Sequence, residues 1–304
     1  MISLSWASKK RCTSYFVPTS TITLTVSFKL RHSKLFQMGS VRFLGAALVT
    51  GASQGIGKAI AIRLASDGYR VALNDISRKR EQLEAVAKDL NQRHGAYTSV
   101  VIPADVTREE EVEEMVSYSS KELDGLDVMV ANAGIIGPTK PITELSMEEW
   151  EQVQQVNLRG VFMCYKWAAK HMIAQGRRGR IIGASSMGGK QGAPNLSSYI
   201  AAKFGVRGLT QAAGKDFNKD QASRYDLSVA LELGIYGITV NAYAPAQSIL
   251  ADPSSAKQVL ATLPSFAKVG QPEDVASIVS YLASKEAHHI TGQTISVNAG
   301  MYFD

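Results

Sequence analysis

Short apolar runs alternate with longer segments of helical period along most of this chain. Apolar runs of this length are typical of parallel strands that are buried on both faces. The predicted strands are Leu44–Val49, Tyr69–Leu73, Tyr97–Ile102, Val128–Ala131, Arg180–Ala184, Ile238–Ala242 and Thr294–Val297. The predicted helices are Lys58–Ala65, Arg78–Leu90, Glu109–Leu123 and Met147–Ile173. This alternation predicts an α/β fold: one doubly wound parallel sheet of about seven strands, with helices on both faces and ligand at the carboxyl ends of the strands.

A glycine-rich turn joins the first predicted strand to the first predicted helix. Glycines permit positive φ and leave room for a pyrophosphate, whose charge is stabilised by the free N–H groups and dipole of the following helix. The spacing is a variant of the Rossmann-type dinucleotide fingerprint, so a purely structural tight turn is the alternative. The residues predicted to bind a cofactor in this turn are Gly51, Ser53, Gln54, Gly55, Ile56 and Gly57.

An acidic residue after the second predicted strand bears on the choice of cofactor. Asp75 lies eighteen residues after Gly57, where a carboxylate accepts hydrogen bonds from an adenosine ribose and repels a 2′-phosphate. NAD is therefore favoured over NADP, although Arg78 and Lys79 offer the positive charge that NADP requires. The alternative is that Asp75 is a turn residue at a strand end.

The ends of the third and fourth predicted strands supply further candidates. Asp105 and Val106 are predicted to meet the adenine, with an aspartate helix cap as the alternative for Asp105. Small residues let a backbone lie against a nucleotide. We therefore add Asn132, Ala133 and Gly134 to the predicted cofactor contacts.

A tyrosine and a lysine four residues apart carry the most specific chemical signal. On a helix, Tyr199 and Lys203 share one face. A tyrosine hydroxyl ordinarily ionises near pH 10, but an ammonium about 4 Å away favours the phenolate by roughly 4 kcal/mol at an effective dielectric of about 20. The hydroxyl can then exchange a proton with an alcohol or carbonyl oxygen. Of the pair Ser185 and Ser186, only one is expected to face this site, because side chains alternate along a strand.

These motifs resemble the short-chain dehydrogenase/reductase family over roughly Gly45 to Met301. The motifs that carry the resemblance are TGASQGIG, DVT, NAG, VNLRG, YIAAK and VNAYAP. The resemblance implies hydride transfer between nicotinamide and a secondary carbon, with Tyr199 as general acid/base. It also implies that Lys203 assists Tyr199 and binds the nicotinamide ribose and that Ser186, which has the family spacing, orients the carbonyl. The resemblance further implies that Asn157 holds a water in the proton relay. The alternative is that Asn157 is a polar helix residue whose side chain bonds to the backbone. Pro245 is added to the predicted cofactor contacts.

Within the family, the chain looks most like diacetyl (acetoin) reductases and 2,3-butanediol dehydrogenases. The expected substrate is therefore a small vicinal diketone, acetoin or a related secondary alcohol. A larger sugar, polyol or secondary-metabolite ketone is the alternative, and so is a catalytically silent dinucleotide-binding paralogue. Relatives of this kind suggest a homotetramer or homodimer.

The chain departs from the family pattern at several positions, of which Ala246, Leu250 and the insert at 214–229 favour the silent alternative. Ala131 replaces an asparagine, Ala246 replaces a glycine, and Leu250 stands where a threonine is usual. The stretch from Gln247 to Gly270 is shorter than a butanediol dehydrogenase substrate loop. An insert of about sixteen residues, 214–229, interrupts the region after Lys203, either as a tolerated loop or as a translated intron.

Composition changes this interpretation only at the N-terminus. The net charge is +6, but six of the 33 basic residues precede Met38, which leaves 27 basic against 27 acidic side chains. A neutral body argues against nucleic acid. Residues 1–37 are predicted to be a basic extension, disordered or a mitochondrial transit peptide, and residues 38–304 the dinucleotide-binding and catalytic domain. No membrane span is expected. The two cysteines suit a reducing compartment and do not indicate a metal site. We therefore expect a cytoplasmic location, or the mitochondrial matrix if residues 1–37 are a transit peptide.

Overall fold

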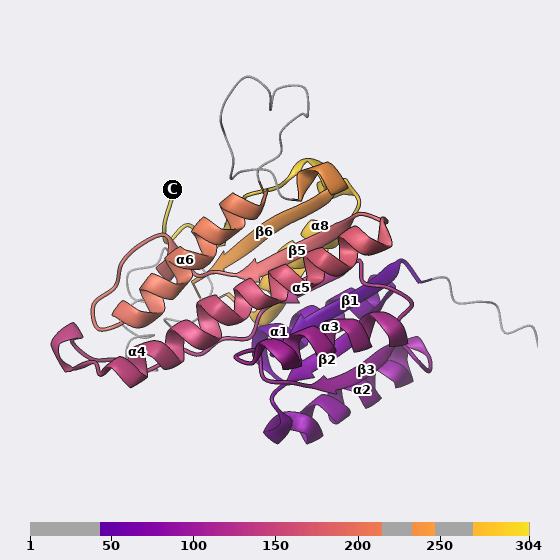
Figure 1. Cartoon of the computed structure of the whole chain (residues 1–304), viewed down its shortest axis with the longest axis horizontal. Helices are drawn as coiled ribbons and strands as arrows, with labels where there is room; N and C mark the ends of the chain where they lie inside the picture. The colour runs from indigo at the N-terminus through magenta and orange to yellow at the C-terminus, as the bar shows by residue number, and fades with distance from the viewer. Residues whose placement is uncertain (1–42, 215–232, 247–269, 304) are drawn as a thin grey trace, which may run out of the picture. The chain divides into compact units, whose positions relative to one another are not determined.

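The computed structural model describes residues 43–214, 233–246 and 270–303, which contain a seven-stranded parallel sheet. The predicted extension at 1–37, Leu250 and the insert beyond Gly214 lie outside these residues. The strands are β1 (Gly45–Thr50), β2 (Tyr69–Asp75), β3 (Ser99–Pro103), β4 (Val128–Ala131), β5 (Gly179–Ala184), β6 (Ile238–Pro245) and β7 (Thr294–Val297). Their order is β3-β2-β1-β4-β5-β6-β7 (Figure 1). The order reverses between β1 and β4, which is where open α/β sheets bind ligands.

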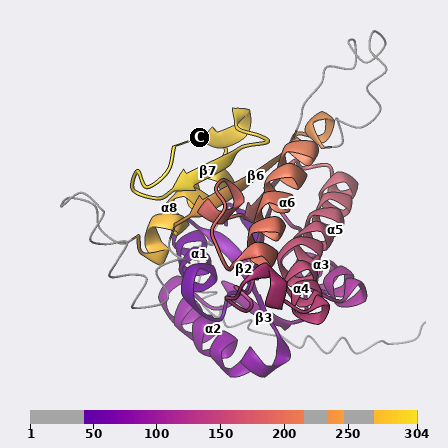
Figure 2. The same ribbon diagram turned by 90° about the vertical axis from the view of Figure 1, so that its left-hand side faces the viewer.

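Helices cover both faces of the sheet, which confirms the doubly wound α/β prediction (Figure 2). One face carries α1 (Gly55–Ser66), α2 (Arg80–His94) and α8 (Pro272–Ala283). The other face carries α3 (Glu109–Glu122), α5 (Gly160–Gln175) and α6 (Ser197–Gly214). The short α4 (Met147–Gln154) leads into α5. In the part of the chain that the structure describes, no helix combines the length and the apolar character needed to cross a bilayer.

Each face of the sheet has its own apolar core. Ile60 of α1 and Val279 of α8 are fully buried in the first core. In the second core, Val112 and Met115 of α3 point inward, as the apolar positions between the glutamates of that helix predict. The two cores fix the helices against the sheet, so the loops at the carboxyl ends of the strands stand on a rigid base.

Two predicted strand starts are wrong, and one predicted helix contains a turn that the sequence does not predict. Leu44 is 61% exposed and precedes β1, because backbone pairing with β2 begins at Gly45. Tyr97 has φ +70° and lies in a turn before β3, although its residue type favours strands. The predicted helix Met147–Ile173 is divided by a π-helical turn, Gln155–Arg159, between α4 and α5. The apolar period continues on both sides of that turn, so the sequence alone does not reveal it.

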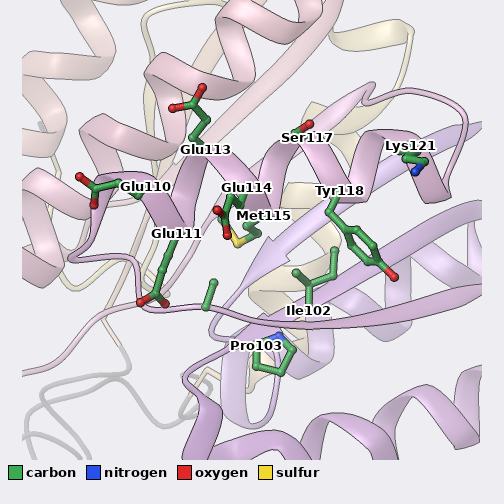
Figure 3. A pocket seen from close by; sticks show the side chains of 11 residues that line it. Ile102, Pro103, Glu110, Glu111, Glu113, Glu114, Met115, Ser117, Tyr118 and Lys121 are labelled. Carbon is green, nitrogen blue, oxygen red and sulfur yellow. The ribbon is translucent and has the colours of Figure 1, made fainter.

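A cavity of about 820 Å³ lies between α3 and the end of β3 (Figure 3). Four glutamates of α3 line it, together with residues that include Ile102, Pro103 and Tyr118. None of the residues that the sequence predicts for the site lines this cavity. A cluster of glutamates repels the phosphates of a dinucleotide, so the chemistry of the side chains, not the size of the cavity, locates the candidate site.

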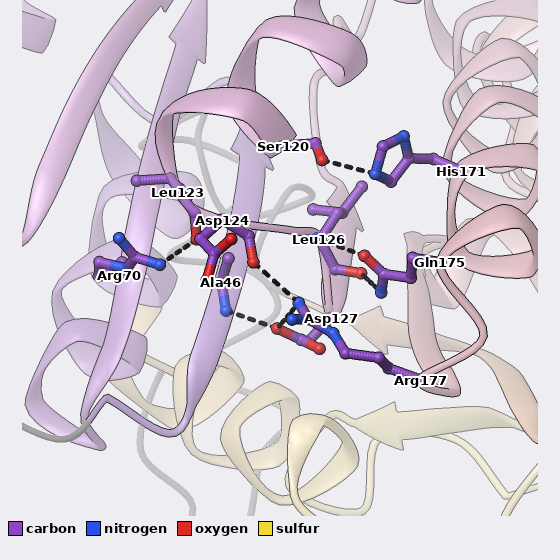
Figure 4. Close-up of polar contacts among 10 residues, drawn as sticks. All are labelled: Ala46, Arg70, Ser120, Leu123, Asp124, Leu126, Asp127, His171, Gln175 and Arg177. Atoms are coloured by element: carbon purple, nitrogen blue, oxygen red, sulfur yellow. Dashed lines mark hydrogen bonds and ion pairs between the residues drawn. The ribbon is translucent and has the colours of Figure 1, made fainter. Parts of the chain in front are cut away.

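Polar contacts fasten the opposite, amino-terminal end of the sheet (Figure 4). The Asp127 carboxylate accepts a hydrogen bond from the Ala46 N–H at 2.8 Å and pairs with Arg177 at 3.4 Å. The Gln175 amide accepts from the Leu126 N–H at 3.1 Å and donates to the Leu126 carbonyl at 2.6 Å. These contacts tie α5 to β1 and β4, and they satisfy backbone groups that would otherwise be costly to bury.

Candidate active site

The glycine-rich turn has the backbone geometry that phosphate binding requires. Gly51 and Gly55 have φ of +66° and +54°, in the left-handed region that glycine tolerates best. A Cβ on Gly57 would lie 2.5 Å from Asn132 Nδ2, so this glycine lets α1 pack against the end of β4. A Cβ on Gly55 would meet no atom within 4 Å. The first residue of α1 thus has open space beside it, and we expect the free N–H groups of this helix end to receive an anion.

A hydrogen-bond network joins the ends of three strands beside this turn. The N–H groups of Asn132 and Ala133 donate to Thr50 Oγ1 at 2.9 and 3.0 Å. Asn132 Nδ2 donates to the Thr50 carbonyl at 2.8 Å, and the Tyr243 hydroxyl donates to Asn132 Oδ1 at 2.7 Å. The Asn132 side chain thus holds β1, β4 and β6 together. The sequence alone assigned no role to Thr50 or Tyr243, although they lie in the motifs TGASQGIG and VNAYAP.

Asp75 contacts the glycine-rich turn directly. Its Oδ2 accepts a hydrogen bond from Ser53 Oγ at 2.5 Å, and its Oδ1 accepts from the Ile76 N–H at 2.9 Å. Lys79 Nζ donates to Gln54 Oε1 at 3.3 Å. The region after β2 thus contains both charges considered from the sequence. The Asp75 carboxylate, bonded to Ser53, favours NAD, and the Lys79 ammonium, bonded to Gln54, favours NADP.

The remaining predicted cofactor contacts lie along the same edge of the sheet. Asp105 Oδ1 accepts hydrogen bonds from the N–H and hydroxyl of Thr107, both at 2.9 Å. The residue that caps α3 is Arg108, so the alternative of Asp105 as a helix cap is wrong. Val106 is buried in the second core, and Ile56 packs against the first. Pro245, the last residue of β6, is paired with Val297 of β7.

The two serines after β5 have different partners. Ser185 Oγ donates to the Lys203 carbonyl at 3.0 Å, which ties β5 to α6. Ser186 Oγ accepts from the Gly188 N–H at 3.1 Å and begins the short 3-10 turn η4 (Met187–Gly189). A Cβ on Gly188 would lie 3.5 Å from Ser186 Oγ and 3.4 Å from Tyr199 Cε1. Ser186 and Tyr199 therefore both lie next to Gly188.

Lys203 is buried on α6 beside Tyr199. Its Nζ lies 5.6 Å from the centre of the Tyr199 ring and donates to the Ala184 carbonyl at 2.8 Å. Only 3% of Lys203 is exposed, and burial lowers the pKa of its amine to about 8. The amine is thus charged at neutral pH, and its field acts in a medium of low dielectric.

Asn157 lies in the π-helical turn and is fully buried. Its Oδ1 accepts from the Ile135 N–H at 2.8 Å, and its Nδ2 donates to the Ile135 carbonyl at 2.6 Å. A Cβ on Gly134 would lie 3.1 Å from Asn157 Oδ1 and 3.5 Å from Lys203 Nζ. The structure thus places Asn157 and Lys203 close to Gly134. The hydrogen bonds of Asn157 to the Ile135 backbone are those expected if it is a polar helix residue satisfied by backbone.

Taken together, these residues fit a dinucleotide with a nicotinamide end. The open backbone at Gly55 suits the pyrophosphate, because any side chain there would fill the space next to the start of α1. Gly134, where a Cβ would be crowded by Asn157 Oδ1, lets the backbone lie close to Lys203 Nζ, among the residues predicted to carry out the chemistry. The pyrophosphate would lie at the glycine-rich turn and the nicotinamide near Lys203 and Tyr199.

Comparison with known families supports the same interpretation. A family model described as short chain dehydrogenase matches residues 45–248. The chain belongs to the short-chain dehydrogenase family. A second family model, described as enoyl-(acyl carrier protein) reductase, matches residues 223–302 of this short-chain dehydrogenase.

Three curated relatives align with this chain over nearly their whole length. A short-chain dehydrogenase/reductase of Armillaria gallica is 47% identical over 271 residues, which cover 85% of this chain and 96% of the relative. The short-chain dehydrogenase/reductase eriH of Hericium erinaceus is 43% identical, covering 84% of this chain and 97% of its own. The 3-oxoacyl-[acyl-carrier-protein] reductase FabG of Staphylococcus aureus is 40% identical, with the same coverage.

Membership establishes the general activity of this short-chain dehydrogenase. It is an oxidoreductase of CH–OH or carbonyl groups, and its family uses NAD(P)(H) and is typically oligomeric. Of the departures from the family pattern, Ala246 is buried, and its N–H donates to the Val297 carbonyl at 3.3 Å. The helix α6 continues to Gly214, where the insert begins.

Proposed function

We propose that this short-chain dehydrogenase interconverts a ketone and a secondary alcohol, with Ser186, Tyr199 and Lys203 as its catalytic residues. The observation that carries the proposal is that Ser186 and Tyr199 both lie next to Gly188, with the Lys203 amine 5.6 Å from the centre of the tyrosine ring. A ketone oxygen bound beside the two hydroxyl groups would receive a hydrogen bond from Ser186 while it exchanges a proton with Tyr199.

Each residue has one task in this proposal. The bound nicotinamide supplies or accepts the hydride. In ketone reduction, Tyr199 gives its proton to the carbonyl oxygen as that oxygen becomes negative, and Ser186 holds the same oxygen in place. The positive charge of Lys203 stabilises the phenolate that Tyr199 becomes. Asn157 and Lys203 both lie beside Gly134, and in this proposal Asn157 holds a water that returns the proton to Tyr199.

The proposed cofactor is NAD(H), because Asp75 occupies the end of β2. Its hydrogen bond with Ser53 fixes the carboxylate next to the turn that receives the pyrophosphate. A carboxylate there accepts hydrogen bonds from the ribose hydroxyls and repels a 2′-phosphate. Lys79, which donates to Gln54, is the residue that would favour NADP(H) instead.

The proposed substrate is a ketone, with diacetyl and acetoin as the first compounds to test. None of the three relatives described above is named for those substrates, and FabG is named for a 3-oxoacyl group. A 3-oxoacyl thioester and a larger cyclic ketone therefore belong in the same panel. A catalytically silent dinucleotide-binding protein is the second candidate, which the alanine at 246 and the leucine at 250 favour.

The test is to follow nicotinamide absorbance with NADH and then NADPH against this panel. Turnover with NADH and at least one ketone is expected. The Tyr199→Phe variant is expected to lose about 100-fold or more in kcat, because it lacks the proton to transfer, while it binds cofactor as the wild type does. Retained turnover in Tyr199→Phe would remove that tyrosine from its role. Cofactor binding without turnover of any ketone would favour the silent candidate.

A further inference from the structure

Tyr243 of β6 carries a buried hydroxyl group that has no part in the proposed mechanism. The side chain is 1% exposed and lies in the first core with Ala184, the residue of β5 with which Tyr243 is paired. Because β5 separates β6 from β4, the side chain crosses β5 to reach the segment after β4. There the hydroxyl donates to Asn132 Oδ1 at 2.7 Å. Since an unpaired buried hydroxyl is costly, this bond accounts for a tyrosine rather than a phenylalanine at position 243.

The Tyr243 hydroxyl determines which way the Asn132 amide faces. Asn132 Nδ2 lies 2.8 Å from the Thr50 carbonyl oxygen and 3.4 Å from that of Gly51. Only the nitrogen of the amide can donate to these carbonyls, so the amide oxygen must face a donor, which is the tyrosine hydroxyl. Burial raises the pKa of Tyr243, so the hydroxyl keeps its proton throughout the neutral and mildly alkaline range.

The Asn132 amide in turn holds the first glycine of the glycine-rich turn. Gly51 has φ +66°, and its carbonyl accepts a hydrogen bond from Asn132 Nδ2. A Cβ on Gly57 would collide with the Gly51 carbonyl oxygen and would lie 2.5 Å from Asn132 Nδ2. The amide and this carbonyl therefore both lie against the first turn of α1. The conformation of the glycine-rich turn thus depends on the orientation of the amide.

A fixed turn matters for cofactor binding because the N–H groups that receive a pyrophosphate belong to the backbone. Backbone groups that are already in place lose less conformational entropy when the ligand binds. Gln54, the N-cap residue of α1, makes no capping hydrogen bond with its side chain. Contacts from other strands therefore fix the turn: Asp75 bonds to Ser53 on one side, and Asn132 bonds to Thr50 and Gly51 on the other.

We propose that Tyr243 is a positioning residue for the cofactor: its hydroxyl fixes the Asn132 amide, and the amide holds the glycine-rich turn in the conformation that receives the pyrophosphate. The inference rests on the proposed function and deepens it, because it adds a residue of β6 to the support of the same dinucleotide site. Tyr243 acts through Asn132 rather than by touching the cofactor. Loss of its hydroxyl is therefore expected to weaken cofactor binding and to leave the chemical step intact.

The experiment compares the wild type with Tyr243→Phe, which removes the hydroxyl and keeps the ring. The Kd of NADH is measured by the fluorescence of the bound nicotinamide, the Kd of ADP-ribose by calorimetry, and kcat at saturating NADH. Both Kd values are expected to rise about tenfold, the factor that corresponds to one lost hydrogen bond, while kcat changes less than about twofold. ADP-ribose carries the pyrophosphate without the nicotinamide, so it reports on the turn separately from the catalytic residues.

Tyr165→Phe is the matched control. Tyr165 is 3% exposed in the second core, and its hydroxyl shares a hydrogen bond with Thr210 Oγ1 at 3.0 Å, which joins α5 to α6. Its loss is expected to lower the Tm about as much as Tyr243→Phe does and to leave both Kd values unchanged. If Tyr243→Phe does not fold, Tyr243→Met replaces it, because methionine also lacks the hydroxyl and adapts to a buried position.

A double variant tests the route through Asn132. Two groups that act in series are not additive, so Tyr243→Phe combined with Asn132→Ala is expected to weaken ADP-ribose binding no more than Asn132→Ala alone. Additive losses would show that the hydroxyl does not act through the amide, and the proposal would be wrong.

Two further outcomes would overturn the proposal. If Tyr243→Phe lowers the Tm but leaves both Kd values at the wild-type level, the hydroxyl supports only the fold. If NADH binding weakens while ADP-ribose binding does not, the hydroxyl acts at the nicotinamide end and not at the turn. Absence of ketone turnover in the wild type is a separate failure, that of the proposed function. The two Kd measurements need no turnover, so they still decide the role of Tyr243.

Discussion

Two consecutive serines that follow β5 have different roles, one in the fold and one in the candidate active site. Ser185 donates to the backbone of α6, and Ser186 approaches Tyr199. Alternation of side chains along a strand predicts that only one of them faces the crevice. The spacing shared with the family selected Ser186, and the bond from Ser185 to Lys203 gives the physical reason why Ser185 is unsuited to the role.

The serine pair therefore yields a paired prediction. Ser185→Ala is expected to lower the free energy of unfolding by about 1 kcal/mol, because a buried hydrogen bond is lost, with little change in kcat. Ser186→Ala is expected to lower kcat by about 100-fold with little change in stability. Urea unfolding and steady-state kinetics of both variants check this. Equal losses of kcat in the two variants would contradict the assignment.

Lys203 is costly for the folded protein, because burial lowers the pKa of its amine to about 8 from an ordinary value of 10.5. Below pH 8 the amine is charged in both the folded and the unfolded chain, and the folded state bears the full cost of desolvation. Between pH 8 and pH 10.5 the unfolded chain binds the extra proton. This group therefore makes stability rise with pH across that window.

We predict that Lys203→Met is at least as stable as the wild type at neutral pH and is inactive. The substitution removes a desolvated charge, and methionine fits a buried position. Urea unfolding of both proteins from pH 7 to pH 10 checks this, because the stability of the wild type relative to the variant should increase with pH. A difference in stability that does not change with pH would contradict the lowered pKa.

At the scale of elements, the π-helical turn between α4 and α5 determines where Asn157 lies. The extra residue in that turn places Asn157 against the backbone of Ile135, on the loop that follows β4. π-helical turns of this kind occur often at functional sites. The sequence pattern predicts one continuous helix, because both halves keep an apolar face and a local insertion of one residue leaves no compositional trace.

Asn157→Ala is expected to lower both stability and activity. It leaves the buried Ile135 N–H and carbonyl without partners, at a cost of about 2 kcal/mol. It also loosens the loop that carries Gly134, so kcat should fall as well. Thermal unfolding and kinetics are the measurements, with the exposed Glu151→Ala on α4 as the control. Normal stability in Asn157→Ala would show that the bonds to Ile135 do not fix the turn.

At the scale of the whole molecule, the catalytic unit is expected to be independent of the first 37 residues. The matches to the two family models together run from residue 45 to residue 302. A protein that begins at Met38 is therefore predicted to keep the Tm, kcat and oligomeric state of the full chain. Differential scanning fluorimetry, light scattering and the NADH assay test this. A lower Tm would assign a structural role to the basic extension.

The insert at 214–229 is the other question at this scale. We predict that a variant without it retains activity, because α6 already carries Tyr199 and Lys203 in place before Gly214. An insertion of this length changes closure entropy little, so its removal should change stability only slightly. Kinetics and light scattering of the deleted variant are the measurements, and loss of activity would show that the insert belongs to the catalytic unit.

The sequence by itself determined the features that local chain geometry fixes. Alternating runs gave the doubly wound sheet, the glycines gave the turn before α1, and four residues on a helix placed Tyr199 and Lys203 together. Each of these depends on bond geometry and on the periods of helices and strands, which are the same in every protein. That is why they were predictable without the fold.

Only the tertiary structure decided the contacts between distant segments. Tyr243 and Asn132 are 111 residues apart, yet one hydrogen bond joins them beside the glycine-rich turn. The position of Ile200 next to Gly188 likewise depends on how α6 packs against the loop after β5. Such contacts arise because two cores bring strand ends and helices together in space, and no spacing along the chain encodes which side chains then meet.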